Sequence, residues 1–207
     1  MVIGVIDYNM GNAQSVINAF EYVGAQALII RNSQDVLSVD KIVLPGVGAF
    51  ADGMNQLKEL GFKDALNKVV LKEKKPFLGI CLGMQLLFEA GEEFGFHAGL
   101  GWLSGRVKKF SSDIGLRIPH VGWNTITLKR KSEMVPAMCD QQDVYFVHSY
   151  HVSDYDEEIC VATTTYGYEF PVIIESRNIF AVQFHPEKSQ EIGLKIVRAF
   201  SKVRSDA

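Results

Sequence analysis

The chain has 207 residues, of which 47% are hydrophobic, and 21 basic residues against 24 acidic ones give a net charge of −3. This length suits one domain, which buries about 70% of its unfolded surface and needs no disulfide or metal to hold a core. The charge balance argues against a general nucleic-acid binder, because such proteins cluster Lys and Arg. We interpret the single basic run, residues 129–131, as a solvated turn.

Neither a secretory signal nor a membrane span is expected. The apolar residues 1–6 lack a basic preceding region and reach Asp7 at once. No run of about 18 apolar residues occurs. The three cysteines, Cys81, Cys139 and Cys160, form an odd set without metal-ligand spacing. They predict reduced thiols, a cytoplasmic protein and no metal site.

The first hundred residues alternate short apolar runs with helical periodicity. Asn12 is placed to cap a first helix that carries apolar residues at helical spacing from Val16 to Val23. Because strands that alternate with helices pair in parallel, this half predicts an α/β sheet. The expected strands are residues 2–6, 27–30, 42–44 and 76–80, and the further expected helices are residues 51–60, 63–73 and 82–89.

The second half is rich in strand-like runs and poor in helices. This pattern predicts antiparallel or mixed extensions of the same sheet. A last helix is expected over residues 190–203. Since no linker, repeat or low-complexity tract interrupts the chain, we predict one continuous domain over residues 1–207. The strand-like runs are residues 106–110, 125–129, 144–148, 160–165, 172–175 and 180–184.

Residues 79–83 have the form Gly-x-Cys-x-Gly and lie between an expected strand and an expected helix. That is the setting of a nucleophile elbow, in which glycines avoid clashes with neighbouring backbone. The turn would expose the thiol of Cys81 at a helix N-terminus, where the dipole favours thiolate. It would also aim the Leu82 N–H at an oxyanion. The alternative is a cysteine packed as a small hydrophobe, which is our interpretation of Cys139 and Cys160.

Among the five histidines, His185 is the candidate general base. It follows an apolar strand that Pro186 stops, and strand ends are common catalytic positions in α/β sheets. Glu187 could accept a hydrogen bond from the second ring nitrogen and complete a triad. A structural histidine followed by a surface glutamate is the alternative. The pairing with the cysteine turn favours the catalytic interpretation, because an imidazole would raise the thiolate fraction.

The cysteine turn and the later His-Pro-Glu together resemble the class I, or triad, glutamine amidotransferases. Further segments are similar to the family of glutaminase subunits of imidazole glycerol phosphate synthase, in family order and nearly end to end. The resemblance implies a flavodoxin-like fold with a mostly parallel central sheet, helices on both faces and an antiparallel extension in the second half. The matching segments are residues 7–12, 44–50, 79–88, 119–124, 145–150 and 183–189.

The same resemblance implies a reaction and a partner. Cys81 would attack the side-chain amide of glutamine and form a thioester, with oxyanion donors from Leu82 and from Val47 or Gly48. No cofactor is implied. The ammonia would pass to a separate (β/α)₈-barrel synthase subunit, which makes imidazole glycerol phosphate and AICAR in histidine biosynthesis. The pair would be a heterodimer, and the isolated glutaminase would turn over slowly.

The remaining site residues also follow from the resemblance. Without it, Gln85 and Glu93 would be read as helix-surface residues and Trp123 as a packed strand end. The implied substrate contacts are Gln85, Glu93, Ser149, Tyr150 and Gly48. The implied partner contacts are Gly11, Asn12, His120, Trp123 and Asn124.

Three alternative functions stay open. Relatives of the subunit can feed ammonia to sugar amination in surface-polysaccharide synthesis, and Asn9 and residues 101–102 differ from those expected in the histidine-pathway form. A cysteine peptidase on the same class of fold would also use an elbow cysteine and a histidine. A non-catalytic binding subunit is the third alternative.

Overall fold

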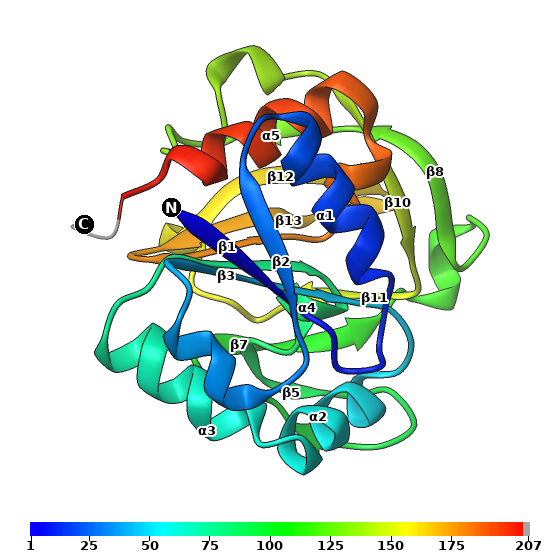
Figure 1. Cartoon of the computed structure of the whole chain (residues 1–207). Helices are drawn as coiled ribbons and strands as arrows, with labels where there is room; N and C mark the ends of the chain where they lie inside the picture. The colour runs from blue at the N-terminus through cyan, green and yellow to red at the C-terminus, as the bar shows by residue number, and fades with distance from the viewer. Residues whose placement is uncertain (205–207) are drawn as a thin grey trace.

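The computed structural model describes residues 1–204, and its centre is an eight-stranded sheet. The strand order is β2-β1-β3-β4-β14-β13-β12-β9 (Figure 1). The strands from β2 to β14 pair in parallel, and the remaining three pairs are antiparallel. This confirms the predicted α/β class. The bounds are β1 Val2–Ile6, β2 Gln26–Ile30, β3 Lys41–Gly46, β4 Phe77–Cys81, β9 Thr127–Leu128, β12 Cys160–Tyr166, β13 Tyr168–Ser176 and β14 Ile179–Val182.

Two smaller sheets hold the other strands of the described residues. The expected antiparallel extension is confirmed for β9, β12 and β13, whereas the expected strands 106–110 and 144–148 lie in the smaller sheets and not in the main one. The expected run 125–129 is split at the buried Ile126, between β8 and β9. One small sheet pairs β8 (His120–Thr125) with β10 (Asp143–His148), and the other has the order β11 (Tyr150–Ser153), β7 (Leu103–Lys109), β5 (Phe88–Gly91), β6 (His97–Ala98).

The helices cover both faces of the main sheet (Figure 1). Helices α1 (Ala13–Tyr22) and α5 (Gln190–Lys202) pack together over one apolar core. Helices α2 (Phe50–Glu59) and α3 (Phe62–Leu66) cover a second core on the other face. As expected, the Asn12 side chain accepts a hydrogen bond from the Ser15 N–H and caps α1.

One helix prediction was wrong. The helix expected over residues 63–73 is present, as α3 followed by a π-helical stretch over Asn67–Lys72. The expected helix 82–89 stops after α4 (Leu82–Gln85), and Phe88 begins β5. The physical reason is burial on all sides: residues 86–88 are fully buried, and a Cβ at Gly99 would lie 2.1 Å from the Phe88 carbonyl oxygen. Close backbone contact of this kind replaces the one-sided packing of a helix.

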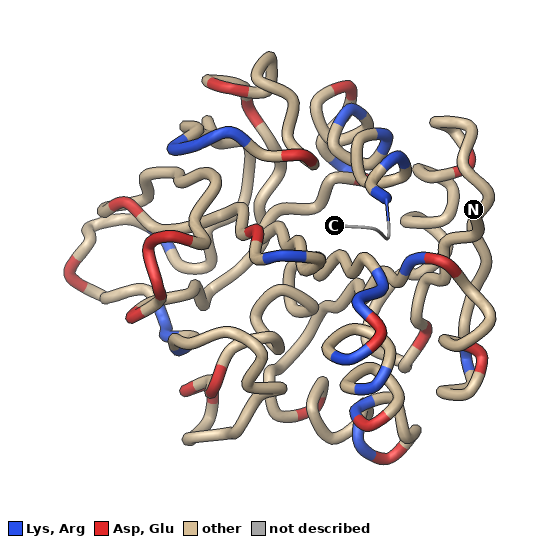
Figure 2. Tube along the Cα trace, turned by 90° about the vertical axis from the view of Figure 1, so that its left-hand side faces the viewer, with Lys and Arg blue, Asp and Glu red and all other residues tan. Residues whose placement is uncertain are grey.

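Charged residues of both signs are mixed along the trace (Figure 2). The basic run 129–131 lies in the loop that follows β9, where Arg130 is half-buried and donates to the Glu175 carbonyl at 2.7 Å, so the solvated-turn interpretation holds only in part. Among the described residues, no helix is both long and apolar enough to span a bilayer.

Candidate active site

The chain reverses sharply at Cys81, between β4 and α4. Cys81 has φ of 55° and ψ of −110°, a conformation that costs an ordinary residue about 1–3 kcal/mol. The flanking glycines are required by backbone contacts. A Cβ at Gly83 would lie 1.8 Å from the Leu44 carbonyl oxygen, and one at Gly79 would lie 2.7 Å from that of Gly83. The Gly-x-Cys-x-Gly turn therefore packs against β3 as an elbow that holds the thiol at the sheet edge.

The partner strand β14 lies directly beside β4, with Val182 paired to Ile80. This parallel pairing brings His185, which follows β14, to the same edge as Cys81. The His185 Nδ1–H donates to Glu187 Oε1 at 2.7 Å, and the two side chains are only 4% and 7% exposed. Ser189 fixes the loop of residues 185–189, because its hydroxyl donates to the His185 carbonyl at 2.7 Å and accepts from the Tyr145 N–H at 3.0 Å.

The charge of His185 is set by opposing effects. Burial by itself lowers the pKa of His185, but interactions with Cys81 and Glu187 outweigh burial and raise the pKa to about 10. Among the described residues, His185 Nε2 is buried and makes no hydrogen bond of ordinary geometry. Cys81 nevertheless raises this pKa through a hydrogen-bond contribution as well as through its charge. The raised pKa of His185 favours an imidazolium, which is held by Glu187.

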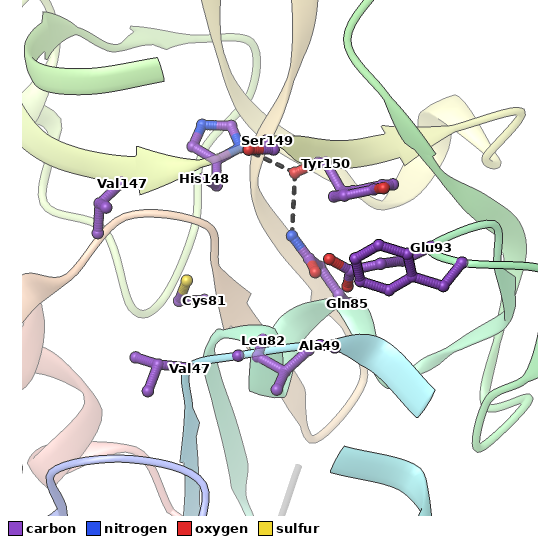
Figure 3. A pocket seen from close by; sticks show the side chains of 12 residues that line it. Val47, Ala49, Cys81, Leu82, Gln85, Glu93, Val147, His148, Ser149 and Tyr150 are labelled. Carbon is purple, nitrogen blue, oxygen red and sulfur yellow. Dashed lines mark hydrogen bonds between the residues drawn. The ribbon is translucent and has the colours of Figure 1, made fainter. Parts of the chain in front are cut away.

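A cavity of about 430 Å³ lies over Cys81 (Figure 3). It brings together all eight residues that were predicted as nucleophile, oxyanion donors or substrate contacts. These residues come from the ends of β3 and β4, from α4, from the loop after β5 and from the junction of β10 and β11. They are Val47, Gly48, Cys81, Leu82, Gln85, Glu93, Ser149 and Tyr150.

The sequence left Val47 and Gly48 as alternative oxyanion donors. In the structure the Val47 N–H donates to the Met10 carbonyl at 2.7 Å, so this N–H is already engaged. Gly48 adopts φ of 96°, which suits glycine, and it borders the cavity. Of the two alternative donors, the structure therefore disfavours the Val47 N–H.

Polar groups of the cavity wall are themselves oriented by hydrogen bonds. Glu93 Oε2 accepts from the Phe50 N–H at 2.9 Å, at the N-terminal end of α2. Gln85 is buried at 6% exposure, which corrects the helix-surface reading. Its Nε2 donates to the Tyr150 carbonyl and to Gln183 Oε1, both at 3.0 Å. The amide oxygen of Gln85 thus remains as an acceptor for a ligand (Figure 3).

The expected partner contacts lie outside this cavity, and the structure divides them. Trp123 is 48% exposed on the sheet of β8 and β10, where Val121 is 56% exposed. His120 is only 3% exposed, so its side chain does not reach a partner, contrary to the expectation. Asn124 is half-buried and donates to the Thr165 carbonyl at 3.0 Å. Gly11 precedes the capping residue Asn12, and a Cβ at Gly11 would lie 3.5–3.8 Å from backbone atoms of Gly46.

Two polar residues at the site were missed from the sequence. His148 lines the cavity, and Gln183 is fully buried with its Nε2 3.7 Å from Cys81 Sγ. A signal existed for Gln183, because it is a lone amide in an apolar strand two residues before His185. For His148 the sequence held no such signal.

Comparisons with known proteins agree with the resemblance drawn from the motifs. Residues 4–202 match the family model described as glutamine amidotransferase class-I. Imidazole glycerol phosphate synthase subunit HisH 1 of Campylobacter jejuni is 46% identical over 98% of this chain and 100% of that protein. The HisH subunit of Geobacter sulfurreducens is 45% identical over 98% of this chain and 99% of its own length.

Solved structures of low sequence identity share the fold. A structure titled as PurLQS from Thermotoga maritima has a TM-score of 0.77 at 20% identity and covers 96% of this chain and of its own. A crystal structure of a glutamine amidotransferase has a TM-score of 0.76 at 19% identity, covering 98% of this chain and 100% of its own.

Proposed function

This chain belongs to the class-I glutamine amidotransferase family, and from that premise we propose that it hydrolyses L-glutamine to glutamate and ammonia at Cys81. The observation that carries the proposal is the strained Cys81, which lines a cavity of about 430 Å³ and interacts with the buried His185–Glu187 pair. The proposed reaction needs no metal or cofactor, because a thiolate and an imidazolium supply the nucleophile and the proton.

In the first half of the reaction, the Cys81 thiolate attacks the side-chain carbonyl carbon of glutamine. The carbonyl electrons move onto oxygen, and the Leu82 and Gly48 N–H groups would stabilise that oxyanion. Losing one such donor typically costs about 2.7–4 kcal/mol of transition-state stabilisation. His185 gives its Nε2 proton to the amide nitrogen, which leaves as ammonia. The product is a thioester on Cys81.

In the second half, the neutral His185 accepts a proton from water as the water attacks the thioester. The oxyanion forms a second time at the same donors, and the Cys81 sulfur leaves as thiolate. Glutamate is released, and His185 is again protonated. Glu187 holds the ring in one orientation and stabilises its charge in both halves, through the 2.7 Å contact with Nδ1.

Recognition of free glutamine needs partners for an ammonium and a carboxylate. We assign the ammonium to Glu93, whose carboxylate is fixed by the Phe50 N–H. The amide oxygen of Gln85 accepts from the substrate, and Ser149 and Tyr150 act on the carboxylate side, with Gly48 close by. These side chains would select an amino acid over a peptide, which has no free ammonium at the same place.

The ammonia requires an acceptor, which we place on another chain. The relatives that are 45–46% identical are named as subunits of imidazole glycerol phosphate synthase. We therefore assign this chain as a glutaminase subunit whose ammonia serves a (β/α)₈-barrel synthase in a heterodimer. Trp123 and Val121, exposed on β8, together with Gly11 and Asn12 from the exposed turn before α1, form the proposed partner face. Delivery to a sugar-aminating enzyme is the alternative.

We further propose that residues 1–207 act as one domain in the cytoplasm. One sheet unites β1 with β14, which supports a single unit. Cys81, Cys139 and Cys160 are all free thiols, as in proteins of a reducing compartment.

The test is a glutaminase assay with and without candidate synthase, on wild type, Cys81→Ala and Cys160→Ala. We expect slow hydrolysis by the wild type alone, faster hydrolysis with the correct partner, and none with Cys81→Ala. Cys160→Ala, which removes a buried thiol outside the cavity, should retain activity. Activity in Cys81→Ala would overturn the assignment, and activation by a sugar-modifying enzyme instead of a barrel synthase would select the alternative partner.

A further inference from the structure

Gln183 is a buried amide that contacts the nucleophile and takes part in none of the steps above. It follows β14 directly and is 0% exposed. Its Nε2 donates to Cys81 Sγ at 3.7 Å, and its Oε1 accepts from Gln85 Nε2 at 3.0 Å. Its backbone N–H donates to the Val172 carbonyl at 2.9 Å, which holds the main chain in place. The side chain is thus fixed between the sulfur and the cavity wall.

The orientation of this amide follows from its neighbours. The Tyr150 carbonyl can only accept, so it requires the nitrogen of Gln85. Gln85 Nε2 also donates to Gln183, so Gln183 presents its oxygen to Gln85 and its nitrogen to Cys81. If the Gln183 amide were reversed, its NH₂ group would face the NH₂ group of Gln85, and its oxygen would face the Cys81 sulfur. The network therefore selects the orientation that favours a negatively charged sulfur.

The Tyr150 carbonyl is in turn held by buried His148, which is itself hydrogen-bonded to buried His120. His148 Nδ1–H donates to this carbonyl at 2.8 Å, so neutral His148 has Nε2 free to accept from His120 Nδ1–H at 3.0 Å. Burial lowers the pKa of His148 to about 3 and that of His120 to about 4. Both rings are neutral at physiological pH, and Asn124 Nδ2 donates to the remaining nitrogen of His120 at 3.2 Å. Each hydrogen bond in this chain, from Asn124 through the two histidines to the Tyr150 carbonyl, thus has one donor and one acceptor.

We propose that Gln183 is a further catalytic residue, whose side-chain amide donates to the Cys81 thiolate, stabilises its charge and ties its position to Gln85. The inference rests on the proposed function, because it concerns the same nucleophile. A hydrogen bond to a charged acceptor is about twice as strong as one between neutral groups, and a buried setting strengthens it further. A neutral S–H is a poor acceptor by comparison, so the contact favours the thiolate specifically.

The direct test is the pH dependence of Cys81 alkylation by iodoacetamide in the full chain, followed by mass spectrometry of the Cys81 peptide. Gln183→Met keeps the shape of the side chain and removes the donor. We expect its alkylation midpoint to rise by about one pH unit, which is a tenfold change in the thiolate equilibrium. Gln183→Glu also keeps the shape but adds a carboxylate beside the sulfur, so its midpoint should rise further.

Asn178 provides the matched control, because it is a buried amide at the opposite end of β14. Its Nδ2 donates to the Val70 and Lys75 carbonyls, both at 2.9 Å. Asn178→Leu should perturb the fold to a similar degree, measured by thermal unfolding, and leave the alkylation midpoint unchanged. Wild-type midpoints in both Gln183 variants would overturn the proposal, and so would an equal shift in Asn178→Leu.

Steady-state kinetics separate this role from a loss of substrate binding. Gln183→Met should lower kcat about tenfold while KM for glutamine changes less than about threefold, since the lost interaction is with the nucleophile. Alkylation needs no glutamine, so it tests Gln183 even if the wild type hydrolyses none. If the wild type hydrolyses glutamine but the alkylation midpoints of the Gln183 variants do not shift, the role of Gln183 is rejected and the proposed function stands. If the alkylation midpoints of the Gln183 variants shift but the wild type hydrolyses no glutamine, the proposed function is rejected and the role of Gln183 stands.

Discussion

The charge on His185 can be altered without changing the imidazole. Cys81→Ala removes the sulfur and leaves both burial and the 2.7 Å bond to Glu187 in place. In the wild type the pKa of His185 rises from 6.5 to about 10 against the effect of burial. With only Glu187 left to oppose burial, we expect the pKa to fall by about one to three in Cys81→Ala.

The size of the effect can be worked from the same values. A rise of the His185 pKa from 6.5 to about 10 means that the folded protein stabilises the protonated ring by about 5 kcal/mol relative to the unfolded chain. Because the folded pKa of His185 lies above the unfolded one, the contribution of this ring is complete below pH 6.5 and is lost as the pH rises through about 10. The contribution of His185 to the free energy of unfolding should therefore fall over that window, and it should fall less in Cys81→Ala.

Histidine side-chain NMR measures the charge directly. Burial lowers the pKa values of His120, His148 and His151, so these rings are neutral at about pH 8. A His97→Gln background removes the remaining histidine signal. The wild type should then show one imidazolium, from His185, and Cys81→Ala should show a smaller protonated fraction. A neutral His185 in the wild type, or the same midpoint in both proteins, would refute the reasoning.

Three further predictions follow from single contacts. Gly83→Ala forces apart the elbow and the Leu44 carbonyl, 1.8 Å from the new Cβ, so kcat should fall about 100-fold in steady-state assays. Glu93→Gln loses its charge but keeps an acceptor for the α2 N-terminus, so KM for glutamine should rise about tenfold at similar kcat; an unchanged KM would remove Glu93 from ammonium binding. Lys41 donates to two carbonyls at the end of α5, and burial lowers its pKa to about 8, below the unfolded 10.5. Wild-type stability should gain a contribution as the pH rises from about 8 to 10.5, and denaturant titrations of Lys41→Met should lack it.

Much of the site could be predicted because its chemistry is local in sequence. The elbow around Cys81 requires glycines two residues away on each side, and Glu187 reaches His185 across two residues. The parallel half of the sheet was also predictable, since β1, β3 and β4 are short apolar runs buried throughout or nearly so. In each case the pattern lies within a single segment of chain.

The failures all depend on contacts between distant segments. Residues 86–88 leave the helix because Leu100 and Leu103 donate backbone hydrogen bonds to the Leu86 and Leu87 carbonyls. His120 is buried by packing against Tyr166 and Phe146, which the local sequence does not indicate. Gln183 meets Cys81 across 102 residues. No periodicity within one segment encodes such pairings.

The position of β14 between β4 and β13 has a consequence for synthesis of the chain. The strand that carries Cys81 is complete by residue 81, but its second neighbour begins at Ile179. During elongation from the N-terminus, one edge of β4 would stay unpaired until β14 has been made, because no earlier strand takes that position in the sheet. A chain released early would carry the nucleophile without His185 or Gln183. Chains that stop before residue 183 would therefore hold the Cys81 elbow without the general base that the proposed reaction requires.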